Sequence, residues 1–211
     1  MQAFIDDIIS NFRPDLETTL RKRLAGQRGW GFGTRRRLSS DPLYKVFELF
    51  KGKQGKRLLG VMAMKSKVVE GTFRIYDYLY FGNIKRSRTT VFEFTSKALA
   101  LSRFSIKPKS TLSSVKELFI TSPPLFATTP EFNERYEIHP QDREAIKIDL
   151  NEDFLDHVGD FPDWTYEGYE NALIAYQPGK SLSVEGLKKE KERFETMCER
   201  LINGRSASEF V

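Results

Sequence analysis

A β-hairpin between Thr72 and Phe94 is the feature that most constrains how this chain can fold. The segment reads TFRIYDYLYFGNIKRSRTTVFEF, with β-branched and aromatic residues on both sides of Gly82-Asn83-Ile84-Lys85. Those four residues are short and polar enough to reverse the chain, so the pattern predicts antiparallel strands over residues 72–81 and 86–95. The hairpin would offer one face to the core and one to solvent, and it carries the densest row of tyrosines in the chain.

The first strand of this hairpin places an acid among apolar residues. Side chains alternate between the two faces of a strand, so Asp77 shares a face with Phe, Ile, Leu and Phe neighbours. A desolvated carboxylate needs partners, and Arg74 or Arg103 could supply an ion pair. Alternatively, Asp77 and Glu93 could form a close pair of acids for acid–base chemistry. We favour the structural role.

The opposite face of the same strand carries Tyr76, Tyr78 and Tyr80, led by Arg74. If this face is exposed, it forms an aromatic and cationic platform that could stack bases or line a ligand pocket. If helices cover it, the tyrosines belong to the core, which we expect for two of the three. These four residues are the candidate ligand-binding site.

The rest of the chain predicts an α+β fold. Strands are expected over 44–51, 57–67, 101–106 and 133–138, with a second hairpin from 164–167 and 172–176. Helices are expected over 111–120, 141–157 and 184–201, the last one ended by Gly204. Strands first and helices later favour an antiparallel sheet of about five to eight strands covered by helices, with an N-terminal helical segment.

The same patterns divide the chain into four parts. We expect amphipathic helices over 1–25, a Gly/Arg-rich loop over 26–43, a single α+β domain over 44–204 and a frayed tail over 205–211. The apolar stripe of the N-terminal helices, which includes Leu16 and Leu20, is typical of a core-facing helix or a dimer seam. Attachment to a membrane surface is the alternative, because Arg and Lys flank the stripe, although Asp6 and Asp7 oppose it.

Charge is distributed unevenly along the chain. The net charge of +5 combines +14 over residues 1–110 with −9 over residues 111–211. The basic half either binds phosphate groups or anionic surfaces, or faces the acidic half within the fold. The candidate residues for phosphate contact are Arg35, Arg36, Arg37, Lys53, Lys56 and Arg57.

Several motifs together resemble a known family. They are GKQGKRLLGVMAMK, FRIYDYLY, TTVFEF, LSRFSIKP, FNERYEIH and WTYEGYENALIAY. Across about residues 44–203 the chain resembles an uncharacterised bacterial domain family with an FDYxY…TVV…LPxFxLxPE pattern, often found downstream of transmembrane helices. The resemblance implies a domain of unknown function and brings no catalytic residues. In this chain an amphipathic segment replaces the membrane helices, and Lys107-Pro108-Lys109 stands where Pro-Glu is usual.

The sequence names no reaction. It has two histidines and one cysteine, without the spacing of a metal site, a nucleophile elbow or a phosphate-binding loop, so we expect no metal and no cofactor. Cys198 is expected to be a buried, inert thiol. No apolar run is long enough to span a bilayer and no secretory signal is evident, so we expect a soluble, cytoplasmic protein, with peripheral membrane attachment as the alternative.

We therefore expect a non-enzymatic binding or scaffold domain for a protein partner or a small apolar ligand. A nucleic-acid-binding protein that uses the basic half is the alternative. An enzyme centred on Asp77 and Glu93 is a weaker third hypothesis. A homodimer and a peripheral membrane protein both remain compatible with the sequence.

Overall fold

A computed structural model describes residues 16–37, 42–52, 54–81, 86–109 and 124–208. Its centre is an eight-stranded sheet in the order β1-β2-β3-β4-β8-β7-β5-β6, in which every neighbouring pair is antiparallel. The strands are β1 (Gly31–Arg37), β2 (Gln54–Lys65), β3 (Thr72–Phe81), β4 (Arg86–Thr95), β5 (Leu101–Pro108), β6 (Tyr136–Pro140), β7 (Thr165–Glu170) and β8 (Ala172–Tyr176). This architecture confirms the predicted α+β fold.

Both predicted hairpins are present. β3 and β4 pair without a register shift from Thr72–Thr95 to Phe81–Arg86, as predicted for strands over residues 72–81 and 86–95. The predicted turn residues 82–85 lie outside the described part of the chain. β7 and β8 form the second hairpin, and Glu170 takes a left-handed conformation with φ of 49° beside the turn residue Asn171.

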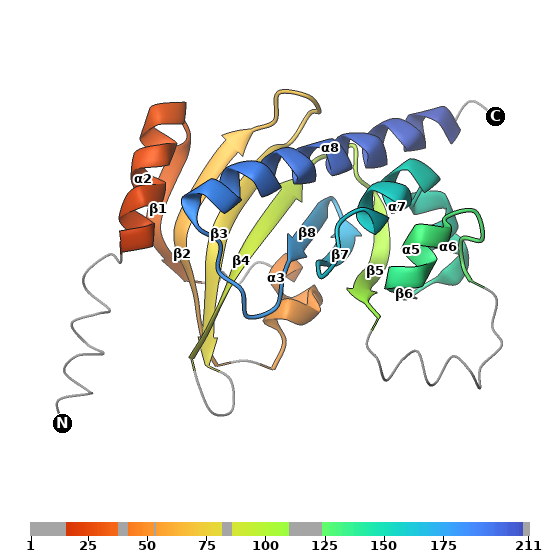
Figure 1. The fold of residues 1–211 in the computed structure, drawn as a ribbon, viewed down its shortest axis with the longest axis horizontal. Helices are drawn as coiled ribbons and strands as arrows, with labels where there is room; N and C mark the ends of the chain where they lie inside the picture. The colour runs from red at the N-terminus through yellow and green to blue at the C-terminus, as the bar shows by residue number, and fades with distance from the viewer. Residues whose placement is uncertain (1–15, 38–41, 53, 82–85, 110–123, 209–211) are drawn as a thin grey trace.

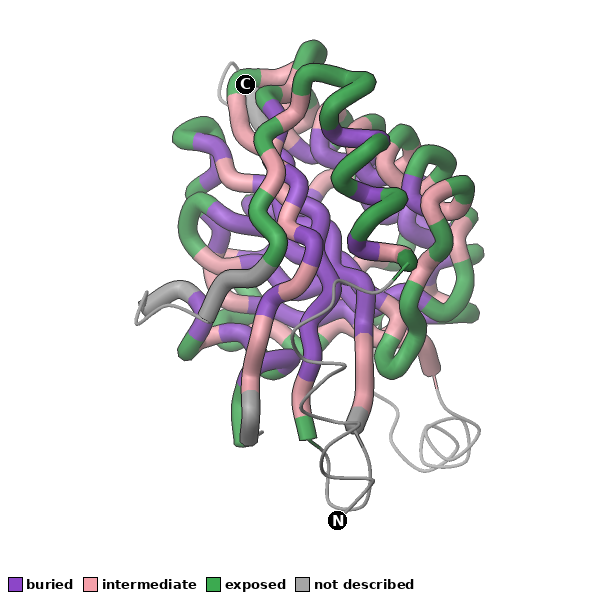
Figure 2. Tube along the Cα trace, turned by 90° about the vertical axis from the view of Figure 1, so that its left-hand side faces the viewer, coloured by how far each residue is buried: buried purple, intermediate pink, exposed green. Residues whose placement is uncertain are grey.

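Most helices cover one face of the sheet, which we call the first face (Figure 1). They are α2 (Leu16–Arg28), α5 (Pro130–Arg135), α6 (Arg143–Asp149), α7 (Glu152–Gly159) and α8 (Val184–Ser208). Their apolar residues and those of the strands form one large core, and Figure 2 shows the buried segments along the middle of the sheet with exposed residues on the outer sides of the helices. This packing holds the sheet rigid beneath α8.

The other face, which we call the second face, has a smaller cover. The short helix α3 (Pro42–Val46) and the 3-10 turn η1 (Glu48–Phe50) lie over it and bury a separate aromatic cluster. In that cluster the Phe50 ring meets the rings of Tyr44 and Tyr78 edge-on, with centroids 5.2 and 4.8 Å away. The tyrosine row of β3 therefore lies beneath α3 and η1.

Two predictions for residues 26–51 are wrong. Gly31–Arg37 is an edge strand on β2 and not a loop, because its backbone pairs with β2 although its side chains show no apolar alternation. Residues 44–51 form α3 and η1 and not a strand. Tyr44 and Phe47 are three residues apart and both buried, which fits helical spacing, but a window this short does not separate the two periods.

Two further boundaries differ from the prediction. The strand expected over 133–138 begins only at Tyr136, because Pro130 starts the short helix α5. The single helix expected over 141–157 is two helices, since Asn151 caps α7 by accepting a hydrogen bond from the Phe154 backbone N–H at 2.9 Å. The helix predicted over 111–120 lies outside the described residues.

The N-terminal helix packs differently from the expected stripe. α2 buries Thr18, Arg21, Leu24 and Ala25 against the first face, whereas Leu16 and Leu20 are exposed. Leu16 and Leu20 therefore do not face the core of this chain, and the dimer seam and the membrane surface stay predictions for them. An arginine takes the central buried position because Asp77 of β3 lies opposite to it.

α8 continues to Ser208, past the glycine that was expected to end it. Gly204 instead provides room, because a β-carbon there would overlap the side chain of Asn151. That side chain is fixed at the start of α7, and it also donates hydrogen bonds to the carbonyl oxygens of Arg200 and Leu201 at 3.1 and 3.3 Å. Gly204 thus allows α7 and α8 to approach closely.

We expect Gly204→Ala to lower the free energy of unfolding by about 1–2 kcal/mol, because Asn151 must move and give up its hydrogen bonds. Helix propensity alone would give a gain of about 1 kcal/mol. Gly186→Ala in the same helix is the matched control, because a β-carbon there meets only ordinary van der Waals contacts. Urea unfolding measures both variants, and equal stabilisation of the two would contradict this role of Gly204.

Candidate functional site

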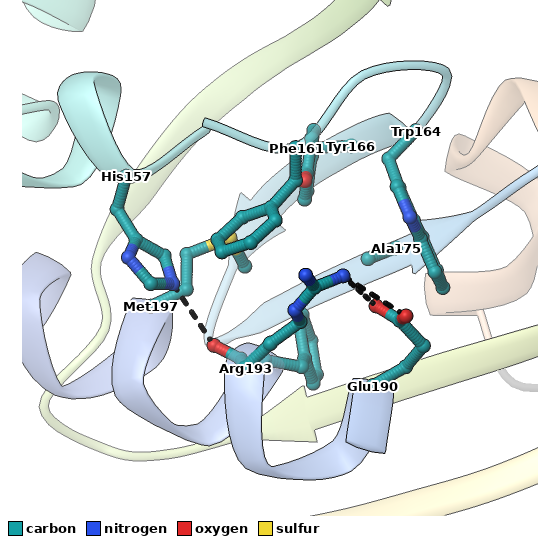
Figure 3. A pocket seen from close by; sticks show the side chains of 9 residues that line it. His157, Phe161, Trp164, Tyr166, Ala175, Glu190, Arg193 and Met197 are labelled. Carbon is teal, nitrogen blue, oxygen red and sulfur yellow. Dashed lines mark hydrogen bonds and ion pairs between the residues drawn. The ribbon is translucent and has the colours of Figure 1, made fainter. Parts of the chain in front are cut away.

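An aromatic pocket lies between α8 and the first face of the sheet (Figure 3). α8 supplies one wall, the turn after α7 and the strand β7 supply the other, and Ala175 of β8 forms part of the floor. The lining residues are His157, Phe161, Trp164, Tyr166, Ala175, Glu190, Arg193, Phe194 and Met197. Most of these side chains are apolar or aromatic, which is typical of sites for small apolar groups.

The back of the pocket is held by ring contacts. The Phe92 ring of β4 packs against Trp164 and Phe194 with centroid distances of 5.6 and 5.8 Å. Met197 adds a flexible thioether that can adapt to different shapes. As it stands the cavity measures about 20 Å³, which is room for a single water-sized group. A larger guest needs a side chain at the mouth to move.

Arg193 closes the mouth of the pocket. Its guanidinium lies over the Phe161 ring, 4.1 Å from the centroid, and pairs with Glu190 at 3.0 Å on the same helix face. Figure 3 shows this pair on α8, with the Arg193 guanidinium beside the Phe161 ring. The Arg193 side chain is 35% exposed, so water competes for both of its interactions. With Glu190 and Phe161, which are also partly exposed, it belongs to the part of the lining that can move without disturbing the core.

His157 forms the polar end of the pocket. Its Nε2 lies 3.2 Å from the backbone carbonyl oxygen of Arg193, and its ring packs edge-on against Phe161. Burial is the main effect on this group and lowers the pKa of His157 below its usual value, so the ring is neutral at pH 7. A neutral imidazole beside aromatic rings suits an uncharged guest.

Asp77 lies on the first face in a buried charge network. The Arg21 guanidinium of α2 meets one oxygen of its carboxylate at 2.9 Å, and the Thr90 hydroxyl donates to that same oxygen at 2.6 Å. Arg88 pairs with the other oxygen. Neither Arg74 nor Arg103 is its partner, so that prediction is wrong. The hairpin register could have indicated Arg88, since pairing residue 77 with Thr90 puts Arg88 on the diagonal.

Glu93 lies on the second face and is completely buried. Its carboxylate accepts hydrogen bonds from the hydroxyls of Tyr76 and Tyr44 at 2.8 and 3.0 Å, and it pairs with Arg74 at 2.8 Å. Glu93 and Asp77 therefore occupy opposite faces of the sheet. The hypothesis that they form a pair of acids for catalysis is wrong.

The structure places the predicted tyrosine site largely in the core. Tyr76 and Tyr78 are buried, as expected for two of the three tyrosines, and only Tyr80 reaches the surface in part, stacked on Tyr78 at 5.0 Å. Arg74 is occupied by Glu93. The row organises the second face and leaves no open aromatic platform.

The predicted phosphate-binding residues are spread over the β1–β2 edge of the sheet. Arg35, Arg36 and Arg37 belong to β1, opposite Leu59, Leu58 and Arg57 of β2, and their side chains lie outside the described part. The Lys56 ammonium donates to the Phe50 carbonyl oxygen. Lys53 lies outside the described residues. Nucleic-acid binding, membrane attachment and homodimerisation therefore stay predictions.

Cys198 is buried, as predicted, and burial raises the pKa of its thiol well above the ordinary value, which disfavours the reactive thiolate. Within the described ranges no group of three or more His, Cys, Asp or Glu side chains could hold a metal ion. None of the helices in those ranges is long and apolar enough to cross a membrane.

Sequence reasoning missed the aromatic pocket. Phe194 and Met197 show on the apolar side of the predicted helix, but this spacing is equally typical of ordinary core packing. The Glu190–Arg193 spacing was a usable signal, because charges three apart meet on a helix surface. What the sequence could not show is that Phe161 and Trp164, from the turn after α7, pack beneath that pair.

No protein-family model matches the chain, and no curated protein matches its sequence. The resemblance to a bacterial domain family therefore stays a prediction. Among solved structures, the mycobacterial trehalose monomycolate transport factor A, TtfA, matches with a TM-score of 0.54 and 13% identity, over 85% of this chain and 93% of that chain. At this identity the likeness shows a shared fold alone.

Proposed function

We propose that this chain is a non-catalytic binding domain whose aromatic pocket beneath α8 receives a small, uncharged, apolar group. The observation that carries the proposal is the construction of the pocket. Its interior is apolar and built on packed elements, while the partly exposed Arg193, Glu190 and Phe161 lie at its mouth.

Opening the pocket costs little. A partly exposed ion pair such as Arg193–Glu190 is worth about 1 kcal/mol or less, and a cation–π contact at the surface contributes about 0.5–1 kcal/mol. Turning Arg193 into solvent therefore costs about 1–2 kcal/mol. Burying a single ring or short alkyl group against Phe161, Trp164 and Met197 offsets that cost, at about 25 cal/mol per Å² of apolar surface.

The arrangement of the acids supports a binding role over catalysis. Asp77 and Glu93 are on opposite faces of the sheet, and both carboxylates are occupied by buried partners. Among the described residues that line the aromatic pocket, the titratable groups are His157, Tyr166 and the Glu190–Arg193 pair. An apolar cavity with a neutral imidazole can select a guest by shape and polarity.

The fold is compatible with this proposal. The protein that shares it is described as a transport factor for trehalose monomycolate, and a transport-associated scaffold that holds an apolar group would use a pocket of this kind. For the present chain the guest is proposed from the pocket alone. A protein partner that inserts an apolar side chain at the same place would use the same chemistry.

We expect the full chain to bind toluene with a dissociation constant in the millimolar range. Arg193→Ala should bind toluene about tenfold more tightly, because no free energy is needed to move the Arg193 side chain out of the mouth. Ala175→Val should weaken binding by filling the floor of the pocket. Isothermal titration calorimetry measures all three proteins, and a negative heat-capacity change marks apolar burial.

Arg200→Ala is the matched control on the same helix. The Arg200 side chain is exposed, donates a hydrogen bond to the Asp153 carbonyl oxygen at 3.4 Å, and is not among the described residues that line the pocket. Its removal should leave toluene affinity within about twofold of the wild type. Equal affinities in wild type, Arg193→Ala and Ala175→Val would show that toluene binds elsewhere.

A further inference from the structure

A second hollow lies on the second face of the sheet, away from the aromatic pocket. α3 and η1 cover β2, β3, β4 and β8 there, whereas β5, β6 and β7 line an open cleft of about 300 Å³ with η1 at its side. This volume is at the lower end of the range for small-molecule sites. Unlike the aromatic pocket, the cleft is polar, and its volume already suffices for a small guest.

The floor of the cleft is one row of residues across three strands. Ser105 of β5 pairs in register with His139 of β6 on one side and with Glu167 of β7 on the other. Residues in register lie side by side on the same face. The three polar side chains therefore point into the same cleft.

The Glu48 and Glu167 carboxylates, which line the cleft, already have hydrogen-bond or ion-pair partners. The Glu167 carboxylate accepts hydrogen bonds from the backbone N–H groups of Glu48 and Leu49 and, at 2.6 Å, from the Tyr176 hydroxyl. Glu48 pairs with Lys107 at 2.6 Å. Glu167 anchors η1 to the sheet, and neither acid is left to bind a cation.

The groups in the cleft that could bind a guest are hydrogen-bond donors. Ser105 is 3% exposed, and its hydroxyl has no hydrogen-bond partner among the described residues although it lines the cleft. The Arg103 guanidinium lines the cleft on the same face two residues earlier, and its charge also acts on the Glu48 carboxylate and the Tyr169 hydroxyl. His139 adds a half-exposed ring that Glu137 holds at 3.3 Å through Nε2. A buried hydroxyl without a hydrogen-bond partner is unfavourable. A guest oxygen that accepts a hydrogen bond from Ser105 would remove this cost.

We propose that this cleft binds the carboxylate group of a small organic acid, with the Arg103 guanidinium and the Ser105 hydroxyl as its two recognition groups. A guanidinium presents two parallel N–H bonds that match the two oxygens of a carboxylate. Ser105 lies deeper, and its hydroxyl completes the contact by donating a hydrogen bond to one of those oxygens.

The charge of the cleft favours a carboxylate over a phosphate. Glu48 and Glu167 stand at the wall, so a dianion would meet more repulsion than a monoanion. Lys107 offsets only the charge of Glu48. The site is independent of the aromatic pocket, because the two lie on opposite faces of the sheet.

The test is a titration of the ¹⁵N-labelled full chain with sodium acetate and with inorganic phosphate at constant ionic strength. Acetate should shift the backbone amide signals of Ser105 and Gly168 in a saturable way. Arg103→Gln should weaken acetate binding about tenfold, whereas Arg23→Gln, an exposed arginine of α2, should change it less than about twofold.

Ser105→Ala separates recognition from folding. It should weaken acetate binding about fivefold without lowering the urea midpoint of unfolding, because the hydroxyl has no partner to lose within the described part of the chain. Three results would each overturn the proposal: no saturable shift with acetate up to about 50 mM, tighter binding of phosphate than of acetate, or equal acetate affinity in wild type and Arg103→Gln.

Discussion

Replacing Asp77 by alanine should lower the free energy of unfolding by about 3–5 kcal/mol, one of the largest effects expected for a single substitution in this protein. Asp77 and Arg21 are both completely buried and meet at 2.9 Å. Without the carboxylate, the Arg21 charge stays in the core beside Thr90 and the Leu182 carbonyl oxygen only, at 3.4 and 3.1 Å. A buried charge without its counter-ion is costly, so α2 should detach from the sheet first.

The reverse change should cost less. In Arg21→Met the Asp77 carboxylate keeps Arg88 and the hydroxyls of Thr90 and Ser181. The double variant Asp77→Ala/Arg21→Met should therefore be more stable than Asp77→Ala alone, a non-additivity that marks direct coupling. Arg23→Met, on the exposed side of α2, is the control and should stay within about 0.5 kcal/mol of the wild type.

Urea unfolding followed by circular dichroism measures this set. A loss below about 1 kcal/mol in Asp77→Ala, or a double variant no more stable than Asp77→Ala, would contradict the role assigned to the network.

Glu93→Ala should be nearly as damaging, at about 3–4 kcal/mol, because it removes a shared acceptor. The hydroxyls of Tyr76 and Tyr44 lie in buried positions and both donate to this carboxylate, as does Arg74. Since α3 carries Tyr44, the change should loosen α3 and η1 from the second face. Glu93→Gln keeps an acceptor oxygen of the same shape and should lose clearly less.

Glu192→Ala is the control for this series, because Glu192 is exposed on α8. It should change the unfolding free energy by no more than about 0.5 kcal/mol. Hydrogen exchange of the η1 amides, including that of Phe50, reports the loosening directly. Unchanged protection of these amides in Glu93→Ala would show that Glu93 does not hold the cover in place.

The sequence predicts those parts of the fold that are determined by residues close together in the chain. The turn between β3 and β4 fixes their register, and with it the two faces that separate Asp77 from the tyrosines. β1 could not be predicted because Gly31 and Gly33 interrupt any alternation, and the strand exists through backbone pairing with β2. α3 and η1 could not be predicted because a seven-residue aromatic run fits either period.

The candidate sites depend on distant contacts, which explains why they escaped prediction. Arg21 and Asp77 are 56 positions apart in the chain and meet only because α2 crosses the first face. Ser105 and His139 become neighbours only when β6 pairs with β5 as the last strand of the sheet. Each of these residues has ordinary local sequence surroundings, so its partner follows only from the strand order and from the placement of α2 on the sheet.

Methyl NMR of methionine-labelled protein tests the central claim, that the pocket beneath α8 binds an apolar group, most directly. Met197 lines the pocket, whereas Met62 and Met64 lie elsewhere in the same core and serve as internal controls. On titration with toluene, the account predicts a saturable shift of the Met197 methyl signal, stronger at each concentration in Arg193→Ala, with Met62 and Met64 unmoved. A Met197 signal that stays fixed while toluene binds, or equal shifts of all three, would contradict it.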